Sequence, residues 1–257
     1  MIYTAPLAAA AVFVLAFLTA LTFSPAHRHE PLETLYEFAA GLIMGTGFIV
    51  GIFYCLDALY GERRDRSIQF WKSLPVSDLT TVLSKFLIPL VILPLLTFAI
   101  TVATQFVMLL ISSAFLLGSG QSVGALGTRM SFIHMSLIFL YHIVTVHGLW
   151  YAPMYAWLLL VSAWARRAPF IWAFMPPFVI WGVEKIAFRT THFLAMLEHR
   201  LTGPQPSNMA PGSTLMDTMS ALTPLQFFST PGLWIGLAIA AAFLAAAVRL
   251  RRYREPI

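Results

Sequence analysis

Long stretches of the chain carry no charged side chain, and the charged residues gather in the short segments between them. A helix needs roughly 20 apolar residues to cross a bilayer, and each stretch is near or above that length. Strands of a membrane barrel would alternate polar and apolar residues instead. The pattern therefore predicts an all-α polytopic membrane protein, with residues 1–257 forming one transmembrane domain. Six spans are expected, at about 6–24, 38–59, 86–113, 134–163, 169–188 and 231–248.

Composition supports this class. Hydrophobic residues make up 59 % of the chain and charged residues 11 %, against roughly 45–50 % and about 25 % in soluble domains. An ordinary soluble enzyme is excluded, because too few charges are present to cover a water-exposed surface. The single cysteine, Cys55, lies within an apolar run, so no intrachain disulfide is expected.

The basic residues indicate the orientation of the spans. If both termini are cytoplasmic, the inner segments hold 11 Lys and Arg residues and the outer segments hold 5, as the positive-inside rule favours. These residues flank apolar spans rather than forming a soluble basic face, so membrane lipid, not nucleic acid, is the expected partner of the charge. In a rival interpretation the first span is a cleaved signal peptide, with small residues at Ser24-Pro25-Ala26, and five spans remain.

Residues 189–229, on the expected outer side, are too many for a simple turn. Thr191–Leu201 is expected to form one short helix, and Thr214 with Asp217 indicates a second capped helix that ends before Pro224. Both pieces are apolar or amphipathic. The segment is therefore expected to be a short outer helical hairpin, either re-entrant or lying in the membrane interface.

The expected inner loop, residues 61–85, begins with a charged stretch. Ile68, Trp71 and Leu74 then follow at three-residue spacing, which predicts a short helix with an apolar stripe. Pro75 ends that helix. Ser77 is expected to cap a new helix that runs into the third span, with Asp78 at its positive end. From the pattern alone, the loop helix could equally rest on anionic lipid at the inner leaflet.

The sequence Ser73-Leu74-Pro75-Val76-Ser77 with the following Lys85 resembles the first cytoplasmic loop of the type 2 permease group of ATP-binding-cassette transporters. The resemblance extends to six spans and to the outer helices before the sixth. One feature departs from the family, which usually has a basic amphipathic helix before the first span; only five residues precede Pro6 here. The resemblance implies a coupling helix that docks on a cytoplasmic ATPase, formed by Asp65, Arg66, Ser67, Ile68, Phe70, Trp71, Lys72 and Leu74.

The resemblance further implies an ATP-driven exporter of the bacterial cytoplasmic membrane that works by alternating access. It would pair with a second copy of the permease or a related one, and with separate ATPase subunits that bind ATP and Mg²⁺. None of the three lysines follows a glycine, so the chain contains no phosphate-binding Gly-Lys motif. The chain itself is thus expected to need no cofactor. Nothing in the sequence selects the substrate.

The alternative is an integral membrane enzyme or a secondary carrier that needs no ATPase. His134, His142 and His147 lie on or near the fourth span, but their spacing matches no metal-binding or hydrolase motif. No catalytic or metal-binding residue is therefore assigned. Polar and aromatic residues within or at the ends of spans are instead expected to line a translocation path; the candidates are Asp57, His142, Trp150 and Glu184.

Overall fold

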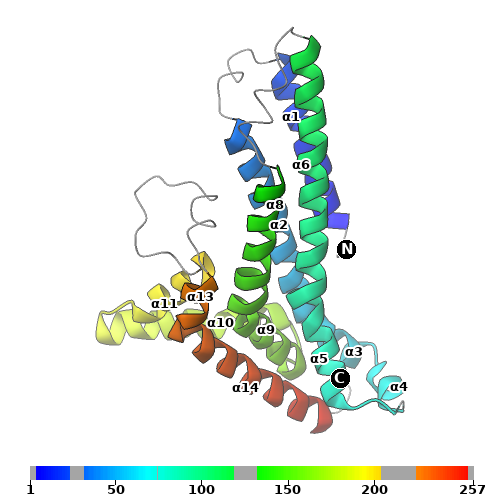
Figure 1. The fold of residues 1–257 in the computed structure, drawn as a ribbon. Coiled ribbons are helices and arrows are strands. Elements are labelled where there is room, and N and C mark those ends of the chain that lie inside the picture. The colour runs from blue at the N-terminus through cyan, green and yellow to red at the C-terminus, as the bar shows by residue number, and fades with distance from the viewer. Residues whose placement is uncertain (1–3, 24–31, 74, 119–131, 204–223, 254–257) are drawn as a thin grey trace. The chain divides into compact units, whose positions relative to one another are not determined.

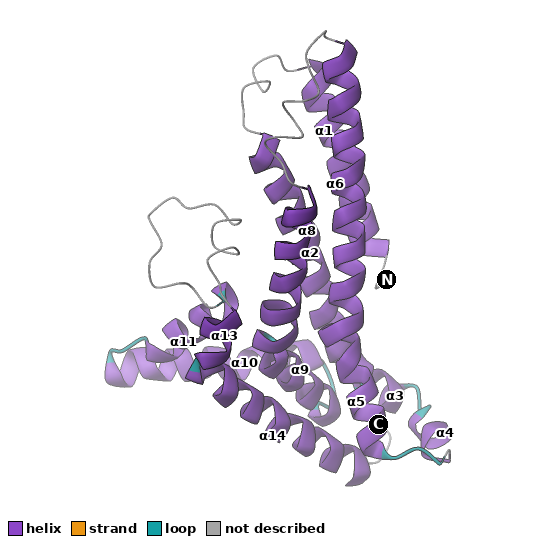
Figure 2. Ribbon diagram, in the orientation of Figure 1, coloured by secondary structure: helices purple, strands orange, loops and turns teal. Residues whose placement is uncertain are grey.

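The computed structural model describes residues 4–23, 32–73, 75–118, 132–203 and 224–253. These residues form helices and short connections, with no strand among them (Figures 1 and 2). Four of the described helices are long and apolar enough to cross a membrane, and the number is five if one bent pair forms a single span. The predicted all-helical fold is thus confirmed among the described residues, and its long apolar helices are compatible with a membrane protein. The count of six spans stays a prediction.

Most predicted elements are present close to their expected bounds. The α-helices are α1 (Thr4–Phe23), α2 (Leu32–Ala58), α3 (Tyr60–Arg64), α4 (Ile68–Ser73), α5 (Asp78–Leu87), α6 (Leu93–Gly118), α8 (Phe132–His142), α9 (Ala152–Trp164), α10 (Pro169–Val183), α11 (His192–Thr202), α13 (Pro224–Ser229) and α14 (Pro231–Tyr253). Among the described residues, three π-helical segments continue α-helices: η2 (Ile88–Ile92), η3 (Ile143–Trp150) and η4 (Glu184–Phe188).

The chain divides into two compact units, and the first contains α1, α2 up to Val50, α6 and α8. Within it α1 runs beside α6 (Figure 1), and Ala10, Ile43 and Ile100 form a buried apolar cluster. Gly47 allows α2 to approach α6 closely, because a Cβ atom there would lie 2.6 Å from the Thr97 hydroxyl oxygen.

The second unit contains the end of α2, α3 to α5, η2, and the helices from η3 to α14. Its central contact is between α9 and α14, where the rings of Trp157 and Phe243 lie 5.5 Å apart. A buried core forms at the N-terminal end of α14. This core consists of Val146, Trp150, Phe227 and Leu233.

The expected fourth span is broken, and the prolines behave differently from one another. Phe139–Trp150 and Ala152–Trp164 meet at a bend of 45°. Pro153 lies in the first turn of α9, where a missing N–H removes no helical hydrogen bond. The bend lies at Tyr151, just before Pro153, on the side where a proline ring crowds the preceding turn. Pro176 and Pro177, in contrast, lie inside the continuous helix α10.

Candidate functional site

The loop between α2 and α5 contains two short helices separated by a reversal of the backbone. Arg66 adopts a left-handed conformation with φ of 57°, which ends α3 and starts the chain toward α4. α4 covers six residues and ends at Ser73, before Pro75. Ser77 then caps α5, its hydroxyl oxygen accepting a hydrogen bond from the Thr80 N–H at 3.1 Å. The predicted helix, stop and cap are all present.

The side chains of α4 separate into a buried residue and an exposed aromatic pair. Ile68 is 3 % exposed, whereas Phe70 is 62 % and Trp71 is 45 % exposed. The two aromatic rings pack edge to face, with 5.6 Å between centroids. The sequence predicts Ile68 and Trp71 on one apolar face of this helix. In the structure Ile68 is buried and Trp71 is exposed, so the two residues do not share one environment. The remaining proposed coupling residues Asp65, Arg66 and Lys72 are exposed, Ser67 is half-buried, and Leu74 lies outside the described residues.

Buried hydrogen bonds attach the start of this loop to the end of α9. The fully buried Ser162 hydroxyl donates to the Leu56 carbonyl at 2.8 Å and accepts from the backbone N–H groups of Leu59 and Tyr60. The Arg63 guanidinium, 3 % exposed, donates to the backbone carbonyl of Ser162 at 2.9 Å and to that of Ala165. Ser162 of α9 thus binds backbone groups at the end of α2 and the start of α3, and Arg63 of α3 binds carbonyls at the end of α9. Helix ends leave such groups without a partner inside the helix.

Four charged residues meet at the base of the loop, and we call them the loop-base cluster: Glu62, Asp78, Lys85 and Arg251. The Lys85 ammonium lies 2.7 Å from the Glu62 carboxylate. Arg251 is paired with Glu62 through Nη1 and with Asp78 through Nε, the latter at 3.0 Å. Arg251, Glu62 and Lys85 are 4, 11 and 18 % exposed in their side chains. Two positive and two negative charges therefore balance in a mostly buried site.

Sequence reasoning did not find this cluster. Glu62 precedes Arg251 by 189 residues, so no local spacing pairs them. Consecutive arginines on a helix point about 100° apart, and here Arg251 is buried while Arg252 is exposed. The positive-inside count treated all such arginines as equivalent.

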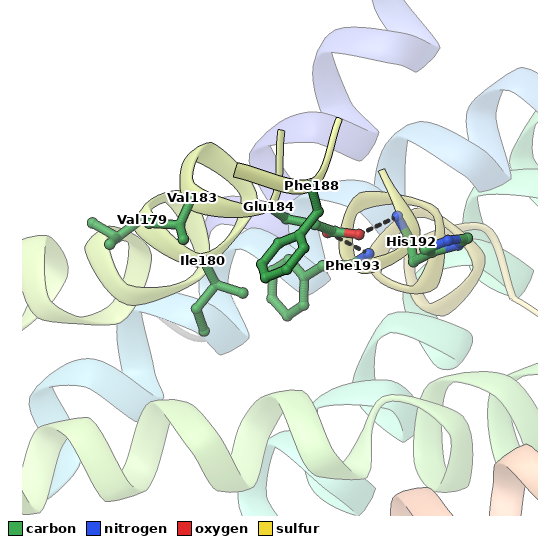
Figure 3. A pocket seen from close by; sticks show the side chains of 7 residues that line it. All are labelled: Val179, Ile180, Val183, Glu184, Phe188, His192 and Phe193. Atoms are coloured by element: carbon green, nitrogen blue, oxygen red, sulfur yellow. Dashed lines mark hydrogen bonds between the residues drawn. The ribbon is translucent and has the colours of Figure 1, made fainter. Parts of the chain in front are cut away.

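Glu184 binds the N-terminal end of α11 (Figure 3). Its carboxylate accepts hydrogen bonds from the backbone N–H groups of His192 at 2.7 Å and Phe193 at 2.9 Å, and from the Thr190 hydroxyl at 2.9 Å. An anion at this position also interacts favourably with the helix dipole. Glu184 thus has three partners in the protein, and it borders an open apolar hollow of about 530 Å³ formed largely by α10 and α11.

The other end of α11 is attached through Trp150 and Arg200. The Trp150 indole N–H donates to the Arg200 carbonyl at 3.1 Å, and the Tyr151 hydroxyl donates to the Leu201 carbonyl at 2.7 Å. The Arg200 guanidinium lies 4.4 Å from the Trp150 ring centroid and donates to the Gly232 carbonyl. Burial lowers the pKa of Arg200, since apolar surroundings disfavour its charge.

The four residues expected along a translocation path have different local surroundings, and the path itself stays a prediction. Trp150 and Glu184 both hold α11, at its opposite ends. Asp57 lies near the end of α2, exposed, with one oxygen 3.9 Å from Arg64. His142 is the last residue of α8 and belongs to the first unit, whereas the other three belong to the second.

Within the described ranges, no group of three or more His, Cys, Asp or Glu side chains is placed to hold a metal ion. The expected helix beginning near Thr214 lies outside the described residues, while Thr191–Leu201 is present as α11, shifted by one residue. Comparisons with protein-family models, with curated proteins and with solved structures gave no match for this chain.

Proposed function

We propose that the chain is the permease subunit of an ATP-driven exporter, with six spans and both termini in the cytoplasm. Separate cytoplasmic ATPase subunits bind ATP and Mg²⁺, and α4 is the coupling helix that docks on them. A second permease, identical or related, completes the membrane part. The substrate moves outward by alternating access in the bacterial cytoplasmic membrane.

The observation that carries this proposal is the exposed aromatic pair of α4. Phe70 and Trp71 are consecutive, so they point about 100° apart on the helix and form a ridge rather than a flat face. A helix that rests on lipid presents one broad apolar face. Here the inward apolar residue, Ile68, is already buried by protein. A ridge of two aromatic side chains fits a cleft in a partner protein, and such residues commonly anchor interfaces.

The attachment of the loop supports the same function. A coupling element must not move freely, because a flexible loop would absorb the displacement of its partner. The Ser162 and Arg63 hydrogen bonds join the loop to α9, and the loop-base cluster joins it to α5 and α14. The absence of a Gly-Lys motif from the sequence is consistent with an ATPase on a separate chain.

The direct test is Trp71→Ala in a chain that is co-expressed with its proposed ATPase subunit. Loss of a buried aromatic anchor costs about 2 kcal/mol or more, so we expect a roughly thirtyfold weaker association. The measurement is the amount of ATPase that purifies with each permease, together with ATP hydrolysis. Tyr253→Ala is the matched control, because Tyr253 is a 71 % exposed aromatic residue at the end of α14. Equal ATPase retention by both variants would contradict the proposal.

A further inference from the structure

The two ends of the coupling loop are bound by one side chain from a distant helix. Glu62 lies before α4 and Asp78 after it, and both carboxylates pair with the Arg251 guanidinium of α14. Arg251 uses Nη1 for the first and Nε for the second, as a planar guanidinium with several donors allows. A lysine offers one ammonium group at this place and cannot reproduce two contacts in fixed directions.

Lys85 makes the arrangement asymmetric. It pairs with Glu62 and also donates to the Ala58 carbonyl at the end of α2. The first end of the loop is therefore held by Lys85, Arg63 and Ser162 as well as by Arg251. Among the ion pairs of the described residues, Asp78 has Arg251 as its partner. The second end thus depends on α14 more than the first end does.

We propose that Arg251 is a positioning residue that clasps both ends of the coupling loop and transmits its displacement to α14. This inference rests on the proposed function of α4 and adds the route by which a partner's movement reaches the membrane. When the loop is displaced, Glu62 and Asp78 move the guanidinium, and the C-terminal end of α14 follows. α14 packs along α9, so the displacement reaches both helices.

The first experiment needs no partner protein. Amide hydrogen exchange is measured at Trp71, whose N–H donates to the Ser67 carbonyl at 3.0 Å, in the purified chain in lipid nanodiscs. Arg251→Met removes both ion pairs and is expected to speed exchange about tenfold or more, because the second end of the loop is released. Arg252→Met is the matched control, since it removes an exposed arginine from the same helix end. Exchange at the parent rate in Arg251→Met overturns the clasp.

The second experiment measures transmission in the complex with the ATPase. Cys55 is replaced and a cysteine is placed at Ala241, an exposed position on α14. Its alkylation rate is compared with and without ATP and vanadate. In Arg251→Met we expect the ATPase to remain bound and to hydrolyse ATP, while the change at residue 241 is lost. Arg251→Lys keeps the charge and one contact, so it is expected to show part of the change at residue 241. The control Arg252→Met is expected to show the full change. A full response in Arg251→Met refutes the transmission route.

Asp78→Asn covers the case in which Arg251→Met does not fold. It opens only the second end of the loop and leaves Glu62 with both of its cations. We expect the same faster exchange at Trp71 and the same loss of response at residue 241. The two proposals fail differently: a permease that binds no ATPase refutes the function of α4, whereas unchanged exchange at Trp71 refutes the clasp alone.

Discussion

Two short helices, α4 and α11, are both held at each end of their segment, but by different chemistry. The loop that carries α4 is fixed at both ends by largely buried pairs of charged side chains, in addition to the hydrogen bonds of Ser162 and Arg63 at its start. α11 is fixed by side chains that bind its backbone: Glu184 accepts from N–H groups, and Trp150 and Tyr151 donate to carbonyls. A charge pair involves two side chains, and loss of one leaves a buried charge. A released backbone group near the surface can bind water instead.

This difference predicts that the α4 region is sensitive to single substitutions and that the α11 region is tolerant of them. Exposed salt bridges contribute little to stability, whereas removal of one partner from a buried pair is strongly destabilising because it leaves an uncompensated charge.

The largest expected difference is that the α4 loop and α11 lie on opposite sides of the membrane, and labelling of single cysteines measures it. With Cys55 replaced, Val76→Cys and Met196→Cys place thiols beside α5 and on α11, both at exposed positions. An impermeant maleimide added to whole cells is expected to label residue 196 and not residue 76. Permeabilised cells provide the control, in which both react. Labelling of residue 76 alone in whole cells would reverse the proposed orientation.

The next effect is on stability at the loop base. Glu62→Gln keeps the side-chain shape but leaves Lys85 and Arg251 without their shared negative charge, and removal of one partner from a buried pair costs about 3–5 kcal/mol. Asp65→Asn is the control, because Asp65 pairs with Arg64 on the surface and such pairs contribute about 1 kcal/mol or less. Thermal unfolding in detergent compares the two variants. A Glu62→Gln variant as stable as Asp65→Asn would contradict the importance given to burial.

A smaller effect is expected where Glu184 meets α11. Glu184→Gln removes the charge and one acceptor from the helix N-terminus, for a cost of about 1 kcal/mol. The expected result is faster amide exchange at His192 and Phe193 in a chain that folds normally. Glu198→Gln, an exposed change within α11, serves as control. Any loss of transport in Glu184→Gln with unchanged exchange would favour the original path hypothesis over the role at α11.

The smallest effect concerns Gly236 of α14. A Cβ atom at this position would lie 1.4 Å from Nη2 of Arg200, so Gly236→Ala must displace the guanidinium from Trp150 and Gly232. Gly182 has open space around it. There, Gly→Ala is expected to stabilise the helix by about 0.5–1 kcal/mol, whereas Gly236→Ala is expected to gain less or to destabilise. Paired unfolding measurements give the sign, and equal gains would show that the Arg200 contacts contribute little.

Local patterns predicted the fold well because local forces produce it. Apolar runs predicted the long apolar helices, Pro75 and Ser77 predicted the end of α4 and the start of α5, and α11 was predicted to within one residue. Contacts between distant segments were missed. No spacing rule joins Glu62 to Arg251 or Ser162 to Leu59, and the capping of α11 by Glu184 crosses eight residues and a π-helical segment. The left-handed Arg66 was missed because glycine is the residue expected there.

The separation of Glu62 from Arg251 has a consequence for biosynthesis. At roughly 5–20 residues per second, the 189 residues between them take about 10 to 40 seconds to translate. During that interval Glu62, Asp78 and Lys85 carry a net negative charge, and the loop has no guanidinium to close it. The ion pairs that join Glu62 and Asp78 to Arg251 can therefore form only after α14 has been synthesised. For the proposed permease, a closed coupling loop would then be a late product of translation, and an ATPase that needs this closed loop would bind only the completed chain.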